Sequence, residues 1–180
     1  MEVRLHQMQA AEMGRRLRAR EIDLCVASQP VPGQDLDAVL LIDEPVALVT
    51  APGHRLAGRA SVSVAELAEE SFVTTRTGHW QRALLDRLFA SAGLGAPRIA
   101  YEGDEPSTTG VLAAAGIGVG LIPAMARRSS TQAPVAWIEV EDPACRRVLT
   151  LLRPADVPPT GAARLMHAAL TGWDWASGPL

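Results

Sequence analysis

The side chains best suited to bind a small molecule follow one predicted strand and precede one predicted helix: Thr74, Thr75, Arg76, Thr77 and Gly78. The first turn of a helix leaves backbone N–H groups unpaired, and the helix dipole favours negative charge at that end. Threonine hydroxyls add donors, and a guanidinium can pair with a carboxylate through two hydrogen bonds. This pattern predicts a site for a small anion. An alternative stays open, in which Thr77 only caps the helix and Arg76 faces water.

Two charged clusters favour structural roles. Three acidic residues precede another predicted helix: Glu102, Asp104 and Glu105. We predict that Asp104 or Glu105 caps that helix and complements its dipole, and a ligand or metal role is the less favoured alternative. Four arginines lie near the end of a predicted helix: Arg15, Arg16, Arg18 and Arg20. Cations are favourable there, so we interpret this run as a solvated face and not as a DNA contact.

The sequence predicts neither a metal site nor covalent catalysis. The four histidines form no H-x-x-x-H pair and the two cysteines no C-x-x-C pair. Cys25 lies in the apolar run Ile22–Ala27, which favours a small buried residue over a nucleophile. His54 follows Pro-Gly in a turn, and we predict a structural role for it. Without a G-x-S-x-G or P-loop motif, no catalytic residue and no cofactor is assigned.

Length and composition predict a globular chain with an aliphatic core. Of 180 residues, 48% are apolar but only 4% are aromatic, and the net charge is −3. That charge argues against a free-standing nucleic-acid-binding domain, which usually presents a basic face. Two cysteines do not make a disulfide framework. The apolar runs are shorter than a membrane span and charged residues follow Met1 at once, so we expect a cytoplasmic protein without a signal peptide.

Strands and helices alternate along the chain, which predicts an α/β fold with largely parallel strand pairing. The predicted strands are Val3–His6, Ile22–Ala27, Leu36–Ile42, Val46–Thr50, Ser71–Thr75, Arg98–Tyr101, Val119–Ile122, Val135–Val140 and Val148–Leu152. The predicted helices are Gln9–Arg20, Gly78–Ala92, the segment from Pro106 to Gly116, and the segment after Thr160. The run Ile22–Ala27 is typical of a central parallel strand.

Local motifs mark the ends of several elements. Asp43, Glu44 and Pro45 interrupt two predicted strands and form a candidate hinge. Ser63-Val64-Ala65-Glu66 is a capping box, and Thr160 can cap the last helix.

The glycines at Gly116, Gly118 and Gly120 lie between a helix and the strand that follows it. A dinucleotide-binding loop has the opposite order, since its glycines lie between a strand and the next helix. Gly116 is suited to the left-handed position that ends a helix, with Ile117 folding back on Leu112. The pattern therefore predicts a tight return from helix to strand and not a phosphate cradle.

Three stretches together resemble the effector-binding domain of LysR-type bacterial transcriptional regulators. Tyr101–Pro123, YEGDEPSTTGVLAAAGIGVGLIP, is similar to the family's acidic-Pro-Ser/Ala-Thr turn, helix and A-A-G-x-G-V-x-L-x-P strand. Leu17–Ala27, LRAREIDLCVA, resembles its L-x-x-G-E-L-D-L-A passage. Glu44–Ala57, EPVALVTAPGHRLA, resembles its E-P-L-x-L-V-x-P-x-H-P-L-A crossing. The three occur in the family's order and spacing and cover most of the chain.

The resemblance implies an α/β, two-lobed fold like the type 2 periplasmic binding proteins, truncated at the N-terminus. Lobe one would comprise residues 1–45 and 148–180, and lobe two residues 46–147. The chain would lack the winged helix-turn-helix, the linker helix and the first strand–helix unit of lobe one, which would leave lobe one under-packed. DNA would be reached only through a helix-turn-helix that is absent from this chain.

The resemblance also implies a function, which is to sense a small-molecule effector, often a carboxylate, in the cleft between the lobes. It places the Thr74–Gly78 loop beside that cleft and adds three ligand-binding positions: Gln9, Ser28 and Gly118. Gln9 stands where many family members have serine or threonine. The intact regulator would be a homo-oligomer. Two alternatives stay open, a stand-alone solute-binding or interaction module and, less favoured, an enzyme on the same fold.

Overall fold

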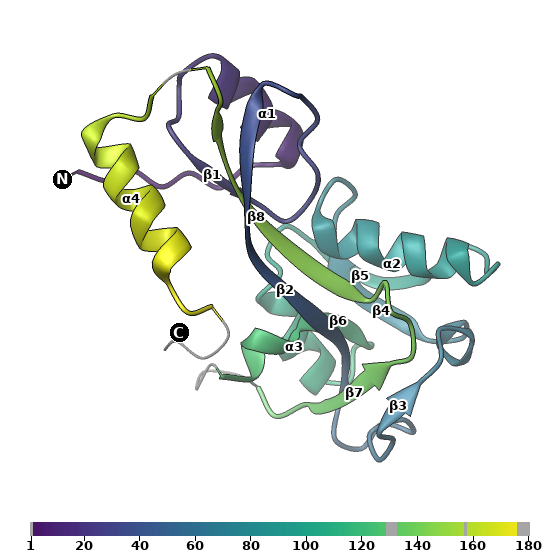
Figure 1. Ribbon diagram of the computed structural model, residues 1–180. Coiled ribbons are helices and arrows are strands. Elements are labelled where there is room, and N and C mark those ends of the chain that lie inside the picture. The colour runs from purple at the N-terminus through teal and green to yellow at the C-terminus, as the bar shows by residue number, and fades with distance from the viewer. Residues whose placement is uncertain (1, 129–132, 157, 176–180) are drawn as a thin grey trace. The chain divides into compact units, whose positions relative to one another are not determined.

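The computed structural model describes residues 2–128, 133–156 and 158–175 (Figure 1). Its helices are α1 Ala10–Arg18, α2 Trp80–Ser91, α3 Thr108–Ala114 and α4 Gly161–Gly172, with short 3-10 helices η1 Ala65–Leu67 and η2 Ala124–Arg128. Its strands are β1 Cys25–Ala27, β2 Leu36–Thr50, β3 Ser61–Val62, β4 Ser71–Thr75, β5 Arg98–Gly103, β6 Gly120–Pro123, β7 Ala136–Val140 and β8 Arg146–Pro154. The chain divides into unit 1, Met1–Asp43 with Val148–Pro179, and unit 2, Glu44–Arg147.

The core of unit 2 forms where α2 packs on β4. Four of the five residues of β4 are buried. The apolar face of α2 repeats with helical period, as predicted: Leu84, Leu85, Leu88 and Phe89. Phe89 near the end of α2 meets Phe72 near the start of β4 edge to face, with ring centroids 5.5 Å apart. The helix therefore runs back along the strand, and the loop that joins them lies at the carboxyl end of β4.

The strands of unit 2 mix parallel and antiparallel pairing. β4 pairs in parallel with β5, and β3 pairs in parallel with β7. β2 pairs antiparallel with both β6 and β7, so the prediction of largely parallel pairing is wrong for this strand. Strand direction depends on partners far apart in the sequence, such as Val46 with Pro123, and local patterns do not contain it.

β2 is one continuous strand of 15 residues, so the break predicted at Asp43–Pro45 is wrong. A proline removes one backbone donor but leaves its neighbours free to pair. Next to it, Val46 N–H donates to Cys145 O at 2.9 Å. β2 and β8 lie side by side (Figure 1), and each strand belongs partly to unit 1 and partly to unit 2.

The predicted local motifs at helix ends are confirmed. In the capping box, Ser63 N–H donates to Glu66 Oε2 at 2.9 Å. Thr160 Oγ1 accepts a backbone N–H of α4 at 3.2 Å. After α3, a glycine with φ of 76° turns the chain, and Ile117 N–H donates to Leu112 O at 3.1 Å. These motifs join residues three to five apart, which is why the sequence reveals them.

Unit 1 packs α1 against the sheet around a small apolar cluster: Leu17, Cys25, Ala27 and Leu152. β1 pairs antiparallel with β8 and, among the described residues, ends the strand order, so the prediction of a central parallel strand at Ile22–Ala27 is wrong. The prediction of a strand at Val3–His6 is wrong, because this segment forms no backbone pairing with any described strand. A cavity of about 720 Å³ is lined by this segment, β1 and α4.

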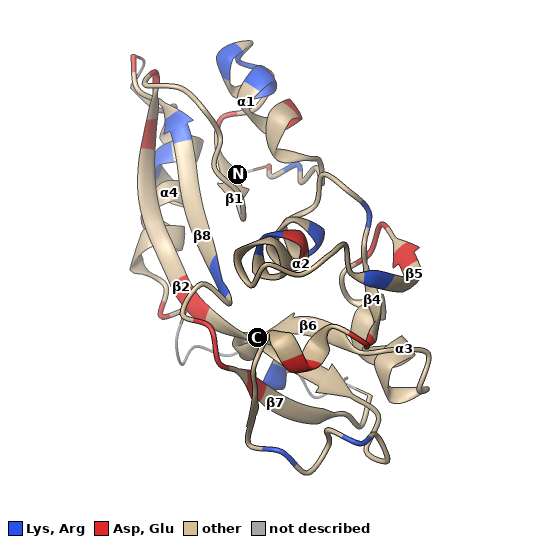
Figure 2. Cartoon of the chain, turned by 90° about the vertical axis from the view of Figure 1, so that its right-hand side faces the viewer, with Lys and Arg blue, Asp and Glu red and all other residues tan. Residues whose placement is uncertain are grey.

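Basic residues gather on α1, as the blue segments of Figure 2 show, and they pair with nearby carboxylates. Arg15 and Arg16 each lie 2.7 Å from Glu12 Oε1, and Arg18 lies 2.7 Å from Asp35 Oδ2. The predicted solvated face is therefore confirmed. Among the described residues, every helix is too short or too polar to cross a lipid bilayer.

Candidate functional site

The loop predicted to bind a ligand joins the end of β4 to the start of α2. Thr74 and Thr75 end the strand and are 3% and 1% exposed, whereas Arg76, Thr77 and Gly78 are exposed. Gly78 has φ of 96°, a left-handed conformation that glycine adopts without strain. Arg76 N–H donates at 2.9 Å to the carbonyl of the last residue of β5. These contacts anchor the loop to the sheet.

The hydroxyl groups of Thr74 and Thr75 are buried and form no hydrogen bond to any described residue. An unpaired buried hydroxyl costs about 1–3 kcal/mol, so such groups are rare in folded proteins. Successive side chains of a strand point to opposite faces, so the two hydroxyls do not converge on one point. Thr75 directly precedes Arg76 of the loop, so its hydroxyl is the first candidate for a ligand contact there.

The start of α2 lacks a side-chain cap. His79 is the N-cap residue and its side chain makes no capping hydrogen bond, so the alternative with Thr77 as the cap is wrong. The first turn of α2 also contains no acidic residue. The positive end of the helix dipole and the first N–H groups are therefore not compensated by the helix itself, and an anion can bind them.

Arg76 precedes the N-cap residue of α2 by three positions, and its guanidinium is weakly held. Its Nε is 3.4 Å from Asp104 Oδ1, and both side chains are 62% exposed. An exposed ion pair contributes about 0–1 kcal/mol. A ligand carboxylate can therefore replace Asp104 as the partner of Arg76 at little cost.

Two carboxylates of the acidic cluster before α3 form ion pairs with arginines and do not cap the helix. Asp104 pairs with Arg76, as above, and Glu102 pairs with Arg82 of α2. The N-cap residue of α3 is Ser107, so the predicted capping by Asp104 or Glu105 is wrong. The helix begins at Thr108, three residues after Glu105, so neither Asp104 nor Glu105 occupies its N-cap position. In the described part of the chain, no group of three metal-ligating side chains comes together.

Gln81, in the first turn of α2, is a residue that the sequence reasoning missed. It is 1% exposed, and its amide nitrogen donates to Thr109 Oγ1 at 3.1 Å and to Leu121 O at 2.6 Å. These bonds fix the start of α2 against α3 and β6. The signal was present, because Gln81 lies three and four residues before Leu84 and Leu85 and so shares the buried face of the helix.

The other predicted ligand residues lie apart from the loop or in unit 1. A Cβ added to Gly118 would be 2.4 Å from Ser71 O, at the first residue of β4. Four residues of strand span about 13 Å, so Gly118 lies at the opposite end of β4 from the loop, and it allows two backbones to approach. Gln9 is exposed and precedes α1, and Ser28 is half-buried after β1. Their contact with an effector stays a prediction.

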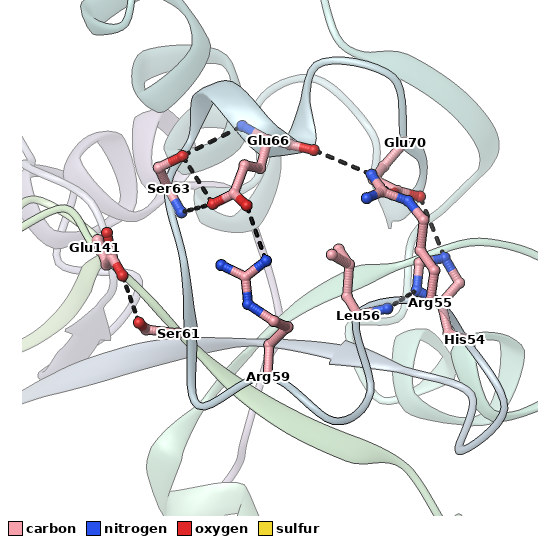
Figure 3. Close-up of polar contacts among 9 residues, drawn as sticks. All are labelled: His54, Arg55, Leu56, Arg59, Ser61, Ser63, Glu66, Glu70 and Glu141. Carbon is pink, nitrogen blue, oxygen red and sulfur yellow. Dashed lines mark hydrogen bonds and ion pairs between the residues drawn. The ribbon is translucent and has the colours of Figure 1, made fainter.

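A second polar cluster surrounds the turn after β2 (Figure 3). His54 Nδ1 accepts from Leu56 N–H at 3.3 Å, and its Nε2 lies 3.2 Å from Glu70 Oε2. Arg55 pairs with the other oxygen of Glu70. Glu70 directly precedes β4, so the cluster ties this turn to the strand. The structural role predicted for His54 is confirmed.

The two cysteines are buried, and burial raises the pKa of Cys25 to about 11 and that of Cys145 to about 12. The thiolate is the nucleophilic form, and at neutral pH it is a negligible fraction of either residue. The prediction that Cys25 is a small buried residue is confirmed.

Comparison with known proteins identifies the family. Residues 1–174 match the family model described as LysR substrate binding domain. The chain belongs to the LysR substrate-binding domain family. The uncharacterized HTH-type transcriptional regulator YybE of Bacillus subtilis (strain 168) is 31% identical over 134 residues, which cover 74% of this chain and 45% of YybE. The transcriptional dual regulator GltC of the same organism is 28% identical over 140 residues, covering 77% of this chain and 46% of GltC. The LysR-type domain thus spans less than half the length of these relatives.

Solved structures confirm the predicted two-lobed α/β fold. The regulatory domain of CcmR from Synechocystis PCC6803, in complex with 2-PG, has a TM-score of 0.82 and 19% identity, covering 95% of this chain and 82% of that chain. The effector binding domain of QuiR, in complex with shikimate, has a TM-score of 0.76 and 19% identity, covering 92% and 78%. Together with the family match, these similarities confirm an effector-sensing regulatory domain of a LysR-type regulator.

Proposed function

We propose that this LysR-type domain senses a small anionic effector, which binds at the Thr74–Gly78 loop and the start of α2. The observation that carries this proposal is the buried, unpartnered hydroxyl of Thr75 beside a helix start without a side-chain cap. A ligand oxygen would satisfy the hydroxyl and the first N–H groups of α2 together. Arg76 would exchange its exposed partner for the ligand's charge.

The class of effector follows from these groups. N–H donors, hydroxyls and a guanidinium together select a carboxylate or a phosphate over a neutral or cationic molecule. Two solved domains of the same fold are described in complex with 2-PG and with shikimate, which supports a small polar ligand. Gln9 and Ser28 of unit 1 are proposed to complete the contacts.

We propose that the role of the domain is regulatory and not catalytic. The proposal is supported by the family match and by relatives that are named as transcriptional regulators. In the intact regulator, binding of the effector would shift the balance between two arrangements of the protein. DNA would be contacted only through a helix-turn-helix outside this chain. The intact regulator is proposed to be a homo-oligomer in the cytoplasm.

Calorimetric titration tests the site. Shikimate, 2-PG and inorganic phosphate are titrated into the wild-type chain and into Thr75→Val, which keeps the branched shape and removes the hydroxyl. Thr50→Val is the matched control, since Thr50 is equally buried but its hydroxyl donates to Ala51 O at 3.1 Å. We expect Thr75→Val to weaken binding about tenfold, as for one lost hydrogen bond to a charged group, and Thr50→Val to bind like wild type. Equal binding by all three proteins would remove Thr75 from the site.

A stand-alone interaction module is the second candidate, and the cavity in unit 1 favours it. Its lining includes apolar side chains of the N-terminal segment, and Leu5 is 91% exposed. An apolar surface of this kind drives association. Sedimentation velocity distinguishes the candidates, because a monomer at all concentrations would argue against the interaction module.

A further inference from the structure

A buried ion pair joins the two strands at the points where the chain enters and leaves unit 2. Glu44 on β2 is 5% exposed, and the side chain of Arg147 on β8 is 14% exposed. Arg147 Nε donates to Glu44 Oε1 at 2.9 Å, and a second guanidinium nitrogen contacts the same carboxylate. Glu44 and Arg147 are the first and last residues of this run of unit 2. The pair therefore fixes the two strand segments to each other.

The same pair reaches two further elements of unit 2. Glu44 Oε2 accepts from Met125 N–H at 2.8 Å, which holds the beginning of η2. The guanidinium carbon of Arg147 lies 5.5 Å from the centroid of the Trp80 ring, within the range of a cation–π interaction. Trp80 is the first residue of α2. Through the contact of Arg147 with Trp80, the ion pair connects both strand segments to the helix that begins at the candidate site.

The first turn of α2 is consequently held from two directions. Trp80 packs against Arg147, and the next residue, Gln81, is bonded to α3 and β6. Separating a buried carboxylate from its guanidinium is strongly unfavourable. Because the ion pair is the stronger contact, a shift of the α2 start either carries Arg147 and Glu44 with it or separates Trp80 from Arg147.

We propose that Trp80 and Arg147 are positioning residues of the effector site. They hold the first turn of α2 in place for the anion, and through Glu44 they link the Thr74–Gly78 loop to the strand segments that leave unit 2. This inference rests on the proposed function for its ligand, but the mechanical link is present without any ligand.

The experiment compares Trp80→Leu, which removes the aromatic face, with Trp80→Phe, which keeps one. Unit 2 offers a matched control in Trp137→Leu, because Arg127 lies 4.9 Å from the Trp137 ring and forms a second cation–π contact. Hydrogen–deuterium exchange of the unliganded chain is followed in the segments 74–82, 42–49 and 146–151. Thermal stability and the affinity for shikimate and inorganic phosphate are measured in parallel.

We expect Trp80→Leu to accelerate exchange in all three segments by about tenfold, as for a lost cation–π contact at a partly desolvated site. Trp80→Phe should restore most of the protection, and Trp137→Leu should leave segments 74–82 and 146–151 unchanged. Segment 42–49 is not compared for Trp137→Leu, because Trp137 is the register partner of Val49. Faster exchange confined to 74–82, or an equal response of segments 74–82 and 146–151 to Trp137→Leu, overturns the link. If the wild type binds none of the anions, the proposed function fails, while the exchange data still decide the link.

Where an anion does bind, the positioning role predicts that Trp80→Leu weakens it more than Trp137→Leu at equal loss of thermal stability, with rescue by Trp80→Phe. Affinities that follow thermal stability alone in all three variants would show that Trp80 is only a structural residue.

Discussion

Replacing Thr75 by valine should raise the stability of the domain while it weakens the ligand site. The hydroxyl is buried and has no partner among the described residues. Its removal recovers the cost of an unsatisfied group, about 1–3 kcal/mol. Valine fills the same volume with the same branching, so no cavity forms and the strand preference is retained. We therefore expect the free energy of unfolding to rise by about 1 kcal/mol, the lower end of that range.

Thermal and urea unfolding measure this effect. For a chain of this size, 1 kcal/mol corresponds to a rise in Tm of about 2–4 °C. Thr50→Val should show the opposite sign, because the hydroxyl of Thr50 is satisfied by Ala51 O and its loss removes a hydrogen bond worth about 1 kcal/mol. If Thr75→Val destabilises the chain as much as Thr50→Val does, the Thr75 hydroxyl is satisfied in the protein and the reasoning that assigns it to a ligand is refuted.

Three further predictions concern packing, pH and reactivity. Gly118→Ala should cost about 1–3 kcal/mol in urea unfolding, because its Cβ would be 2.4 Å from a backbone oxygen, whereas Gly58→Ala, with nothing within 4 Å, should cost nothing. The Arg15 guanidinium beside Glu12 lowers the pKa of that carboxyl to about 2. A carboxyl with a lowered pKa stabilises the fold at pH values above its unfolded pKa of about 4.3. This stabilisation should therefore disappear as the pH falls from about 4 to about 2, and NMR titration of the Glu12 carboxyl checks it. Cys25, with its pKa raised by burial to about 11, should react with a thiol reagent at pH 8 only when the chain is unfolded, and rapid labelling of the native protein would contradict its burial.

Predictions from the sequence succeeded where the deciding contacts are local. The capping box at Ser63, the cap at Thr160 and the Schellman turn at Ile117 each involve partners within six residues. The strand–loop–helix order around Thr74–Gly78 was likewise predicted from apolar periodicity. The sequence predicts these features because capping contacts join residues a few positions apart and the apolar face of a helix repeats every three to four residues.

Strand pairing was beyond the sequence because its partners are distant. The break predicted at Asp43–Pro45 is absent, and Val46 N–H donates a hydrogen bond to Cys145 O, 99 residues away along the chain. Val3–His6 has a strand-like pattern but pairs with no described strand. A pattern of alternating side chains shows that a segment can join a sheet, and only its neighbours determine whether it does.

The candidate site divides in the same way. The sequence alone determined which residues carry the donors and that they precede a helix, because composition and local order are sufficient for both. Tertiary structure alone decided that the Thr75 hydroxyl is buried without a partner, that Gly118 lies at the other end of β4, and that Glu44 meets Arg147 across 103 residues. The physical reason is that burial and ion pairing depend on which surfaces the folded chain brings together, and no local pattern contains that information.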